Sequence, residues 1–387
     1  MTQATTAGPP AARPGIAFAS DARKPWERRF ASFADRAAPG VFLLPAVVAI
    51  LALSIFPLIV SAYLSLTRFK LVKGGFTLQW IGLFNYQKLL FGSQQFHLLG
   101  TFGQPTPIGW VFVALIAGGA LWLLARSARA GVRIPGLVFR VVVVAVVIGL
   151  ALLAAALATE GGELGTFEVT LVYVFGGVTV QFAVGLGLAF LCAQRLAGRR
   201  FFRVVFFMPM MITPVGVAYT FRMLTDTTKG PFTPLWGLFG LTDYAWSVHA
   251  WSARIAVMIG DAWQWIPFMF IVLLAAIENQ SREQVEAAMV DGASRWQIFR
   301  HITVPTILPV SITLFLIRVI EAFKIIDLPN VMTNGGPGIA TESMTLHAFI
   351  AWRTLDLGGS AAVAYMLLIV VAFFCTAFLS FTREVPR

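Results

Sequence analysis

The chain has 387 residues, of which 58% are hydrophobic and only 12% are charged. Soluble domains usually carry about a quarter charged residues, so this composition excludes an ordinary soluble domain and predicts a polytopic membrane protein. The net charge of +11 would suit nucleic acid, but the cations gather at the edges of apolar segments, where they set membrane orientation. The two cysteines lie inside apolar runs and the four histidines are scattered, so neither a disulfide scaffold nor a metal site is expected.

Residues 1–37 are rich in alanine, proline and basic residues and lack the apolar core of a secretory signal. We expect them to form a disordered cytoplasmic tail. The expected organisation continues with a first transmembrane helix and an external segment over 38–107. Two additional transmembrane helices follow over 108–158, and a core transmembrane domain over 168–387.

Eight apolar segments are long enough to cross a hydrocarbon core of roughly 30 Å, which takes about 20 helical residues. They cover about 40–66, 108–126, 135–158, 168–194, 202–225, 253–277, 306–326 and 361–382. Two of them, 202–225 and 253–277, are less purely apolar because they contain prolines and polar residues. The fold class predicted is therefore an all-α polytopic membrane protein with eight transmembrane helices.

The positions of lysine and arginine predict the orientation of these helices. With the N-terminus inside, the cytoplasmic segments and their edges carry nineteen of these cations, against seven for the external segments. An excess of this kind marks the cytoplasmic side. Both termini are therefore expected in the cytoplasm, with the segment 278–305, while the glycine- and proline-rich segment 333–338 is expected outside.

The segment 278–305 is charged and amphipathic in an otherwise apolar chain. Ser281-Arg-Glu-Gln284 and Ser294-Arg-Trp-Gln297 fit capping boxes, each of which starts a helix. Gly292 suits the left-handed position after a helix end, and Pro305 suits the first turn of the next span. The pattern predicts a helix, a tight turn, a second helix and then membrane. On physical grounds alone, such a segment either docks with a soluble partner or lies on the lipid interface.

This segment resembles the EAA loop of ABC importer permeases, by which a permease contacts a cytoplasmic ATPase subunit. The match includes features typical of the sugar-importer subgroup, although Val304 stands where leucine is usual. The resemblance assigns ATPase coupling to Glu286, Ala287, Ala288, Asp291, Gly292, Ala293, Phe299 and Pro305.

Further segments resemble carbohydrate permeases of the same family. They are Phe56-Pro57, Asn85-Tyr86, Arg203 to Pro209 followed by Pro214, Trp263-Gln-Trp-Ile-Pro-Phe268, and Thr333-Asn-Gly-Gly-Pro337. The similarity covers about 40–91 and 168–387. Residues 92–167 depart from the common six-helix form; eight helices are a feature of the maltose-transporter permease. The large external domain of that permease has no counterpart here, because the loop 158–166 is too short.

The resemblance implies the ABC type I importer permease fold and a set of partners. These are a second, homologous permease subunit, two copies of a cytoplasmic ATP-binding subunit, an extracytoplasmic solute-binding protein and a carbohydrate substrate, in a bacterial inner membrane. The sequence contains no Gly-Lys pair and therefore no phosphate-binding loop, so ATP hydrolysis is expected in a partner. No enzyme activity, cofactor or metal is expected in this chain.

Polar and aromatic residues within the predicted spans are candidates for the substrate path, because ionisable residues in membranes usually face protein or water. Glu321 and Lys324 lie three apart on one helix face, which favours an ion pair over a substrate contact. The tryptophans suit sugar stacking, but packing explains each of them singly. The candidates are Tyr219, Arg222, Asp261, Trp263, Gln264, Trp265, Glu321 and Lys324.

These observations favour the translocation subunit of an ATP-driven carbohydrate importer. One alternative is an importer of a polyol or of an anionic sugar derivative, for which Arg222 or Lys324 would be suited. A different class, the ion-coupled secondary transporter, would show internal repeats and intramembrane ion ligands, and the two halves of this chain show no convincing repeat. A non-transporting membrane scaffold is the third possibility.

Overall fold

The computed structural model describes residues 40, 42–101, 106–129, 134–157, 163–194, 198–242 and 244–382. The tail expected over 1–37 lies outside these residues. The chain divides into two compact units, Met1–Val60 and Ser61–Arg387, which are considered separately. The described part of the first unit is helical and belongs to the helix Phe42–Ser65. All other elements belong to the second unit.

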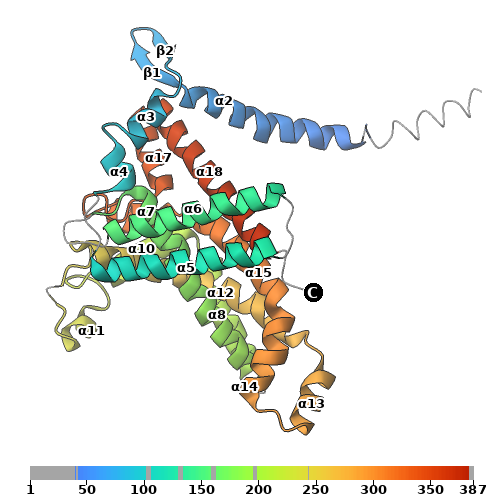
Figure 1. Cartoon of the computed structure of the whole chain (residues 1–387). Coiled ribbons are helices and arrows are strands. Elements are labelled where there is room, and N and C mark those ends of the chain that lie inside the picture. The colour runs from blue at the N-terminus through green and yellow to red at the C-terminus, as the bar shows by residue number, and fades with distance from the viewer. Residues whose placement is uncertain are drawn as a thin grey trace, which may run out of the picture. The chain divides into compact units, whose positions relative to one another are not determined.

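The elements before the core are an apolar helix, a hairpin and four further helices (Figure 1). In chain order they are η1 (Leu51–Ile55), α2 (Phe56–Ser65), β1 (Thr67–Val72), β2 (Gly75–Trp80), α3 (Phe84–Leu90), α4 (Gln95–Leu99), α5 (Pro107–Arg129) and α6 (Ile134–Leu157), where η marks a π or 3-10 turn. The strands pair antiparallel, with Phe69 opposite Leu78. Helices α5 and α6 pack against each other around Val113, Ala151 and Ala155.

The core is a bundle of helices from residue 166 onward. Its elements are α7 (Thr166–Leu171), η2 (Val172–Gly177), α8 (Val178–Ala193), α9 (Arg199–Phe207), η3 (Met208–Met211), α10 (Pro214–Leu224), α11 (Thr233–Leu238), α12 (Ala250–Glu278), α13 (Arg282–Val290), α14 (Arg295–Ile298), η4 (Phe299–Thr303), α15 (Val304–Ala322), α16 (Asp327–Thr333), α17 (Met344–Arg353) and α18 (Leu357–Thr382). The main apolar core is formed by η2, α8, α12 and α15, with partly buried side chains of α18 against it.

Among the described residues, six helices are long and apolar enough to cross a membrane, which confirms six of the eight predicted spans in outline. They are Phe42–Ser65, Pro107–Arg126, Thr166–Ala193, Ala250–Glu278, Arg295–Ala322 and Leu357–Ser380. The segment predicted at 135–158 forms α6, of which only Arg140–Gly149 counts as an apolar helix among the described residues. The total of eight spans and the location of the termini stay predictions.

The segment 202–225 is broken rather than continuous. Its two halves, Phe201–Met211 and Pro214–Leu224, meet at an angle of 99°. Pro214 has no N–H to extend the preceding helix, and it disfavours a helical conformation at Thr213. Thr213 is extended (ψ 145°), and its hydroxyl accepts the N–H of Gly216 to start α10. The break follows from local chemistry, and it leaves either one bent span or a re-entrant turn.

Helices α8 and α12 approach closely at Gly185. A Cβ at this position would lie 2.5 Å from the Cβ of Met269 and 3.2 Å from the backbone nitrogen of Phe270, so larger residues would force the helices apart. Gly260 plays a similar part in α12, where a Cβ would lie 2.6 Å from a methyl of Leu328. Small residues at helix contacts are how membrane helices obtain close packing without a hydrophobic driving force.

A buried charged network joins the three central helices. Arg318 of α15 is 1% exposed and forms an ion pair with Asp261 of α12. Its Nε also donates to Oε1 of Gln181 in α8 at 2.7 Å, and the Gln181 amide donates to Asp261 Oδ2 at 2.7 Å. The guanidinium stands 4.6 Å from the ring centroid of Trp265. Each charge is therefore compensated where water is scarce, as buried ions require.

Removing one partner of this network is expected to lower the free energy of unfolding far more than removing an exposed ion pair does. Arg318→Met leaves Asp261 buried and uncompensated, so we expect a loss of about 3–5 kcal/mol in stability. The double variant Asp261→Leu/Arg318→Met should recover much of that loss, because neither charge is then buried alone. Thermal unfolding of the purified chain in detergent measures both.

The matched control is Lys324→Met, which breaks the exposed pair with Glu321 and should cost less than about 1 kcal/mol. Equal destabilisation by Arg318→Met and Lys324→Met would contradict the role of the buried network.

Candidate functional site

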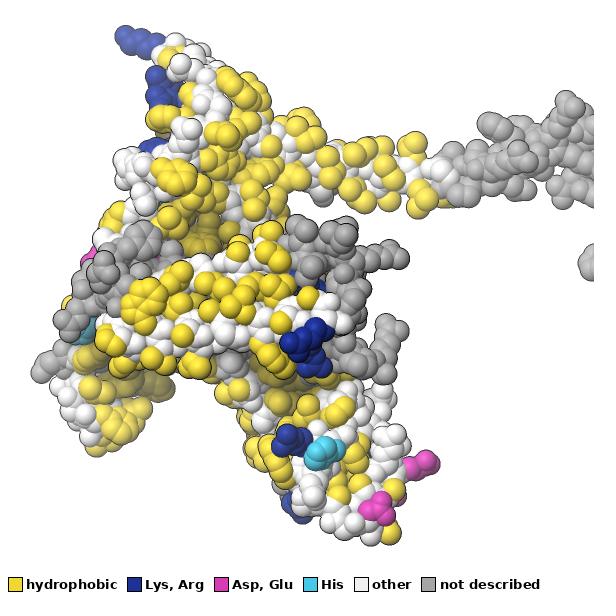
Figure 2. Space-filling model, in the orientation of Figure 1, with side chains coloured by type: hydrophobic (Ala, Val, Ile, Leu, Met, Phe, Trp, Pro, Cys, Tyr) yellow, Lys and Arg dark blue, Asp and Glu magenta, His cyan; other side chains and the backbone are white. Residues whose placement is uncertain are grey.

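Helices α13 and α14 project from one end of the bundle, away from α4 and α17 (Figure 1). None of the residues of α13 is buried. The surface over this region carries charged side chains of both signs beside apolar ones (Figure 2). Met289, Val290 and Trp296 are 56%, 87% and 64% exposed, so three large apolar side chains lie open on this one short projection. Exposed apolar surface of this kind is typical of a contact site for another protein.

The turn between these helices has the geometry predicted at Gly292. The glycine has φ +81°, in the left-handed region, and its N–H donates to the carbonyl of Met289 at 3.1 Å. The N–H of Ala293 donates to the carbonyl of Ala288 at 2.9 Å. This pair of bonds is the Schellman motif, which closes a helix and reverses the chain tightly. The predicted helix, turn and helix are confirmed.

Of the two predicted capping boxes, only the second forms. Ser294 Oγ accepts the N–H of Gln297 at 3.3 Å, while the Gln297 side chain accepts the N–H of Ser294 at 2.7 Å. The box predicted at Ser281 is wrong, because its side chain makes no capping hydrogen bond to α13. The start of α13 is exposed, so water can satisfy its free N–H groups without a cap.

The helix that begins at Arg295 continues into the bundle. The boundary predicted for the span, 306–326, is therefore corrected: one helix runs from Arg295 to Ala322. The π turn η4 ends two residues before Pro305, where a widened turn accommodates a residue that lacks an N–H and crowds the preceding turn. The same arrangement occurs before Pro57, where η1 precedes α2. The projection is thus continuous with a core helix.

Side chains at the base of the projection attach it to neighbouring helices. The ring of Phe299 lies 5.1 Å from that of Phe190 at the end of α8, and 5.5 Å from Trp296. Thr303 Oγ1 donates to the Gln280 side chain at 3.1 Å. Arg203 of α9 forms an ion pair with Glu278 at the end of α12. A displacement of α13 and α14 would therefore also displace α15, α8 and α12, and α9 through its ion pair with α12.

The structure gathers the eight residues expected to serve coupling, and most are accessible. Phe299, Ala288 and Ala293 are partly buried at the base and the turn. The exposed ones are Glu286, Ala287, Asp291, Gly292 and Pro305. The arrangement offers a partner a short helix of mixed polar and apolar residues with little side-chain bulk at its centre.

Three of the substrate-path candidates point into the protein. Asp261 belongs to the buried network, and Trp265 stacks under Arg318. Gln264 is 5% exposed, and its amide donates to the carbonyl of Ile212 at 3.1 Å, which caps the broken end of η3. Its Oε1 is buried without a hydrogen-bond partner among the described residues. Gln264 therefore keeps an acceptor beside the break in the chain.

The other candidates lie nearer the surface. Tyr219 is 55% and Trp263 38% exposed, and the Trp263 ring lies 5.7 Å from Phe221. Arg222 is exposed and donates to the carbonyl of Val331 at 3.1 Å, which joins α10 to α16. Glu321 and Lys324 form an ion pair with N···O 2.6 Å, as their spacing predicts.

Two residues of the buried network, Arg318 and Gln181, are not among the candidates that the sequence indicates. The available signal was that Arg318 and Asp261 lie in different apolar spans and carry opposite charges. A cavity of about 1240 Å³ also lies between α5, α6 and the core, and none of the eight substrate-path candidates lines it.

Comparison with known proteins relates the core to a transport family. Residues 185–383 match the family described as "Binding-protein-dependent transport system inner membrane component". The trehalose/maltose transport system permease protein of Thermococcus litoralis is 32% identical over 215 residues, which cover 56% of this chain and 73% of that protein.

Two solved structures share the fold. A chain in the crystal structure of a bacterial ABC transporter involved in importing the acidic polysaccharide alginate has a TM-score of 0.61 at 18% identity, covering 93% of this chain and 100% of that one. A chain in the bacterial alginate ABC transporter in complex with an alginate pentasaccharide-bound periplasmic protein has a TM-score of 0.52 at 20% identity, covering 57% and 79%.

The left-handed turn at Gly292 predicts that a residue with a Cβ at this position lowers the stability of α13. A Cβ at Gly292 would meet nothing within 4 Å, so Gly292→Ala tests the backbone conformation alone. We expect a cost of about 1–2 kcal/mol, because φ +81° is unfavourable for residues with a Cβ. The amides of α13 should exchange hydrogen faster by about a factor of 5–30 in the full-length chain.

The matched control is Gly187→Ala in α8, where a Cβ also has open space but the helical backbone accepts alanine. Unchanged α13 exchange in Gly292→Ala would argue against the turn as the element that orders this helix.

Proposed function

This chain belongs to the family of binding-protein-dependent transport system inner membrane components, and on that basis we propose that it is the translocation subunit of an ATP-driven carbohydrate importer. The observation that carries the proposal is the projection formed by α13 and α14. It is exposed, shaped by a left-handed turn, and continuous with the helix that holds the buried Arg318. A soluble ATPase that grips α13 would move a helix of the membrane core directly.

The proposed mechanism is mechanical. A helix from Arg295 to Ala322 has 28 residues and a length of roughly 42 Å at 1.5 Å per residue. Its first turns contact α8 through Phe299, and its far half contacts α8 and α12 through Arg318. ATP-driven closure of the partner would tilt this helix as a unit and carry α8 and α12 with it. Alternating access to the two sides of the membrane would follow.

The sequence supports a separate polypeptide as the ATPase. It lacks the Gly-Lys pair of a phosphate-binding loop, so this subunit is proposed to be non-catalytic. The remaining partners are a second homologous permease subunit, two copies of the ATP-binding subunit and an extracytoplasmic solute-binding protein. Lysine and arginine are in excess on the side of the predicted membrane that carries α13 and α14, with nineteen cations against seven on the other side. This excess supports a cytoplasmic location for the projection, in a bacterial inner membrane.

Carbohydrate is the substrate class that the similar proteins support, since one is a trehalose/maltose permease and another belongs to a transporter that imports alginate. The side chains near the break between η3 and α10 suit a sugar. Gln264 holds a buried acceptor, and Tyr219 and Trp263 offer exposed aromatic surface. Arg222 and Lys324 already have internal partners, which favours a neutral sugar over a polyol phosphate or other anionic derivative.

An ion-coupled secondary transporter remains the alternative of a different class. The observation in its favour is Glu168, a carboxylate that is 4% exposed within the spanning helix Thr166–Ala193. Reconstituted alone, such a protein would take up substrate with a proton gradient and without ATP. Co-purification of this chain with an ATP-binding subunit, and uptake that requires ATP, would separate the two functions.

The coupling role predicts uncoupling by changes in the projection. Glu286→Lys reverses an exposed charge on α13, and Gly292→Pro cannot adopt the left-handed turn. In proteoliposomes with the partner subunits, both should lower uptake at least about tenfold, corresponding to about 1.4 kcal/mol of lost coupling, while membrane insertion is kept. ATP hydrolysis and uptake are measured in the same vesicles.

Glu283→Lys is the matched control, since it reverses an exposed charge one turn earlier on α13, outside the predicted contact. Normal uptake by both Glu286→Lys and Gly292→Pro would remove the coupling role from this segment.

The substrate assignment predicts separate effects at two positions. Gln264→Leu removes the buried acceptor, and we expect a loss of affinity or rate for a neutral sugar of about five- to twentyfold, the value of one hydrogen bond. Arg222→Gln combined with Lys324→Gln should leave neutral sugar uptake within about twofold. Strong, selective loss of an anionic sugar derivative in the latter variant would instead establish the anionic substrate class.

A further inference from the structure

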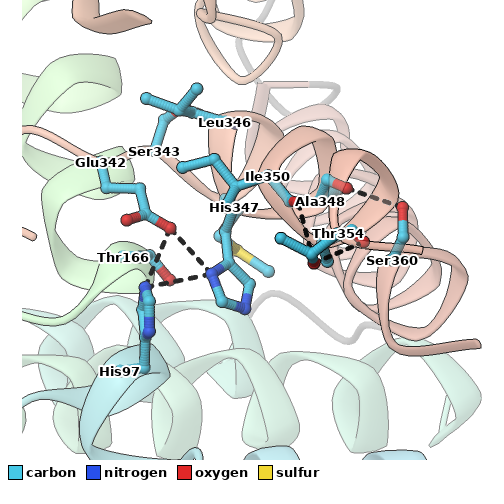
Figure 3. A network of polar contacts seen from close by, with 12 residues as sticks. His97, Thr166, Glu342, Ser343, Leu346, His347, Ala348, Ile350, Thr354 and Ser360 are labelled. Carbon is cyan, nitrogen blue, oxygen red and sulfur yellow. Dashed lines mark hydrogen bonds and ion pairs between the residues drawn. The ribbon is translucent and has the colours of Figure 1, made fainter. Parts of the chain in front are cut away.

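Three side chains from separate parts of the chain converge at one point outside the spanning helices (Figure 3). His97 is in α4, Glu342 precedes α17, and His347 is in its first turn. Oε1 of Glu342 lies 2.9 Å from Nε2 of His97 and 2.8 Å from Nδ1 of His347. The two ring nitrogens lie 3.1 Å apart. Glu342 and His347 are buried, at 4% and 6% exposed.

Hydrogen bonding does not fully account for this triangle of atoms. If both ring nitrogens donate to Glu342, two N–H donors stand with their nitrogens only 3.1 Å apart; if one nitrogen is unprotonated, it is an acceptor that faces the Glu342 carboxylate with no hydrogen between them. A cation between the three atoms removes the conflict, because all three then contribute lone pairs. Around zinc, with bonds of about 2.0–2.1 Å, tetrahedral ligand atoms lie about 3.3 Å apart. The observed separations need to grow by only a few tenths of an ångström.

We propose that His97, Glu342 and His347 form a binding site for a divalent transition metal of the zinc class. Two imidazoles and one carboxylate suit zinc and its neighbours in the first transition row, whereas magnesium and calcium prefer oxygen ligands. The proposal is independent of the transport function and of the coupling projection, which lies at another part of the bundle (Figure 1).

The backbone around the ligands is held in place from several sides, as a metal site requires. Ser343 caps α17 by accepting the N–H of Leu346, and its Oγ donates to the carbonyl of Ile325 at 2.6 Å. The carbonyl of Ala340 accepts Arg254 Nε at 2.6 Å, and that of Thr341 accepts the Tyr173 hydroxyl at 3.2 Å. The backbone around Glu342 and His347 is thus held by hydrogen bonds from η2, from α12 and to the residues after α15, and not by the cluster alone.

A fourth ligand position has a neighbouring polar group. Thr166 at the start of α7 is fully buried, and its Oγ1 has no hydrogen-bond partner among the described residues. Figure 3 shows its side chain beside His97 and Glu342. This hydroxyl is suited to hold a water bound in the fourth position. The His97 side chain is 32% exposed, so it gives the ion a route from solvent.

Metal binding would join parts of the chain that are distant in sequence. His97 lies before α5, whereas Glu342 lies 245 residues later, before α17, and His347 lies 250 residues later, in the first turn of α17. One ion therefore ties the segment α3–α4 to the start of α17. Its role is a cross-link on the side of the bundle away from α13 and α14, where Lys88 of α3 also forms an ion pair with Asp356 before α18.

The test uses the full-length chain, purified in detergent and stripped with a chelator. Titration with zinc against a chromophoric competitor should give one tight site per chain, and cobalt should give the visible absorption of a four-coordinate ion. His97→Ala, Glu342→Gln and His347→Gln should each lower zinc affinity at least about 100-fold. Zinc should raise the melting temperature of the unaltered chain but not of these variants.

His249→Ala is the matched control, because His249 is an exposed histidine stacked on Tyr244 and remote in sequence from the cluster. Its zinc affinity should equal that of the unaltered chain. The proposal is overturned if the chain shows no stoichiometric tight binding, or if binding survives in all three cluster variants. Glu342→Gln keeps the size of the side chain, so loss of binding there without loss of folding separates ligation from stability.

Discussion

The ion pair between Arg318 and Asp261, shared with Gln181, is the interaction on which the membrane core depends. It stands where α8, α12 and α15 meet, and each ion would be costly there without the other. The pair therefore constrains the relative rotation of three helices: each must present one particular face to the centre. The close approach of α8 and α12 at Gly185 adds a steric constraint to this electrostatic one.

The projection formed by α13 and α14 is joined to this ion pair through a single helix. Because the helix bearing Arg318 begins at Arg295, movement at α14 and movement in the core belong to one element. Pro305 does not break this helix, since a π turn precedes it and the wider turn accommodates the missing N–H. By contrast, the break at Thr213 changes the chain direction by 99° and leaves Gln264 to satisfy the freed carbonyl of Ile212. A continuous helix and a broken one thus both pack against α12.

Local patterns were predictable where neighbouring residues decide the outcome. The left-handed turn at Gly292, the capping box at Ser294 and the pair Glu321–Lys324 all involve groups within five residues of one another. The capping box predicted at Ser281 does not form, because water can accept hydrogen bonds from the free N–H groups in the exposed first turn of α13. The start of the span at Arg295 was missed because a proline normally marks a first turn, and the π turn that allows a continuous helix has no simple sequence signal.

The sequence by itself determined the membrane class, the approximate position of most spans and the form of the segment around Gly292, because apolar length, capping and turn chemistry act over short stretches of chain. Only the tertiary structure decided that Asp261 pairs with Arg318 rather than facing a path, and that His97 meets His347. These pairings join residues 57 and 250 positions apart. Contacts at such separations depend on how whole helices rotate and cross, which packing across the entire core sets and no local pattern records.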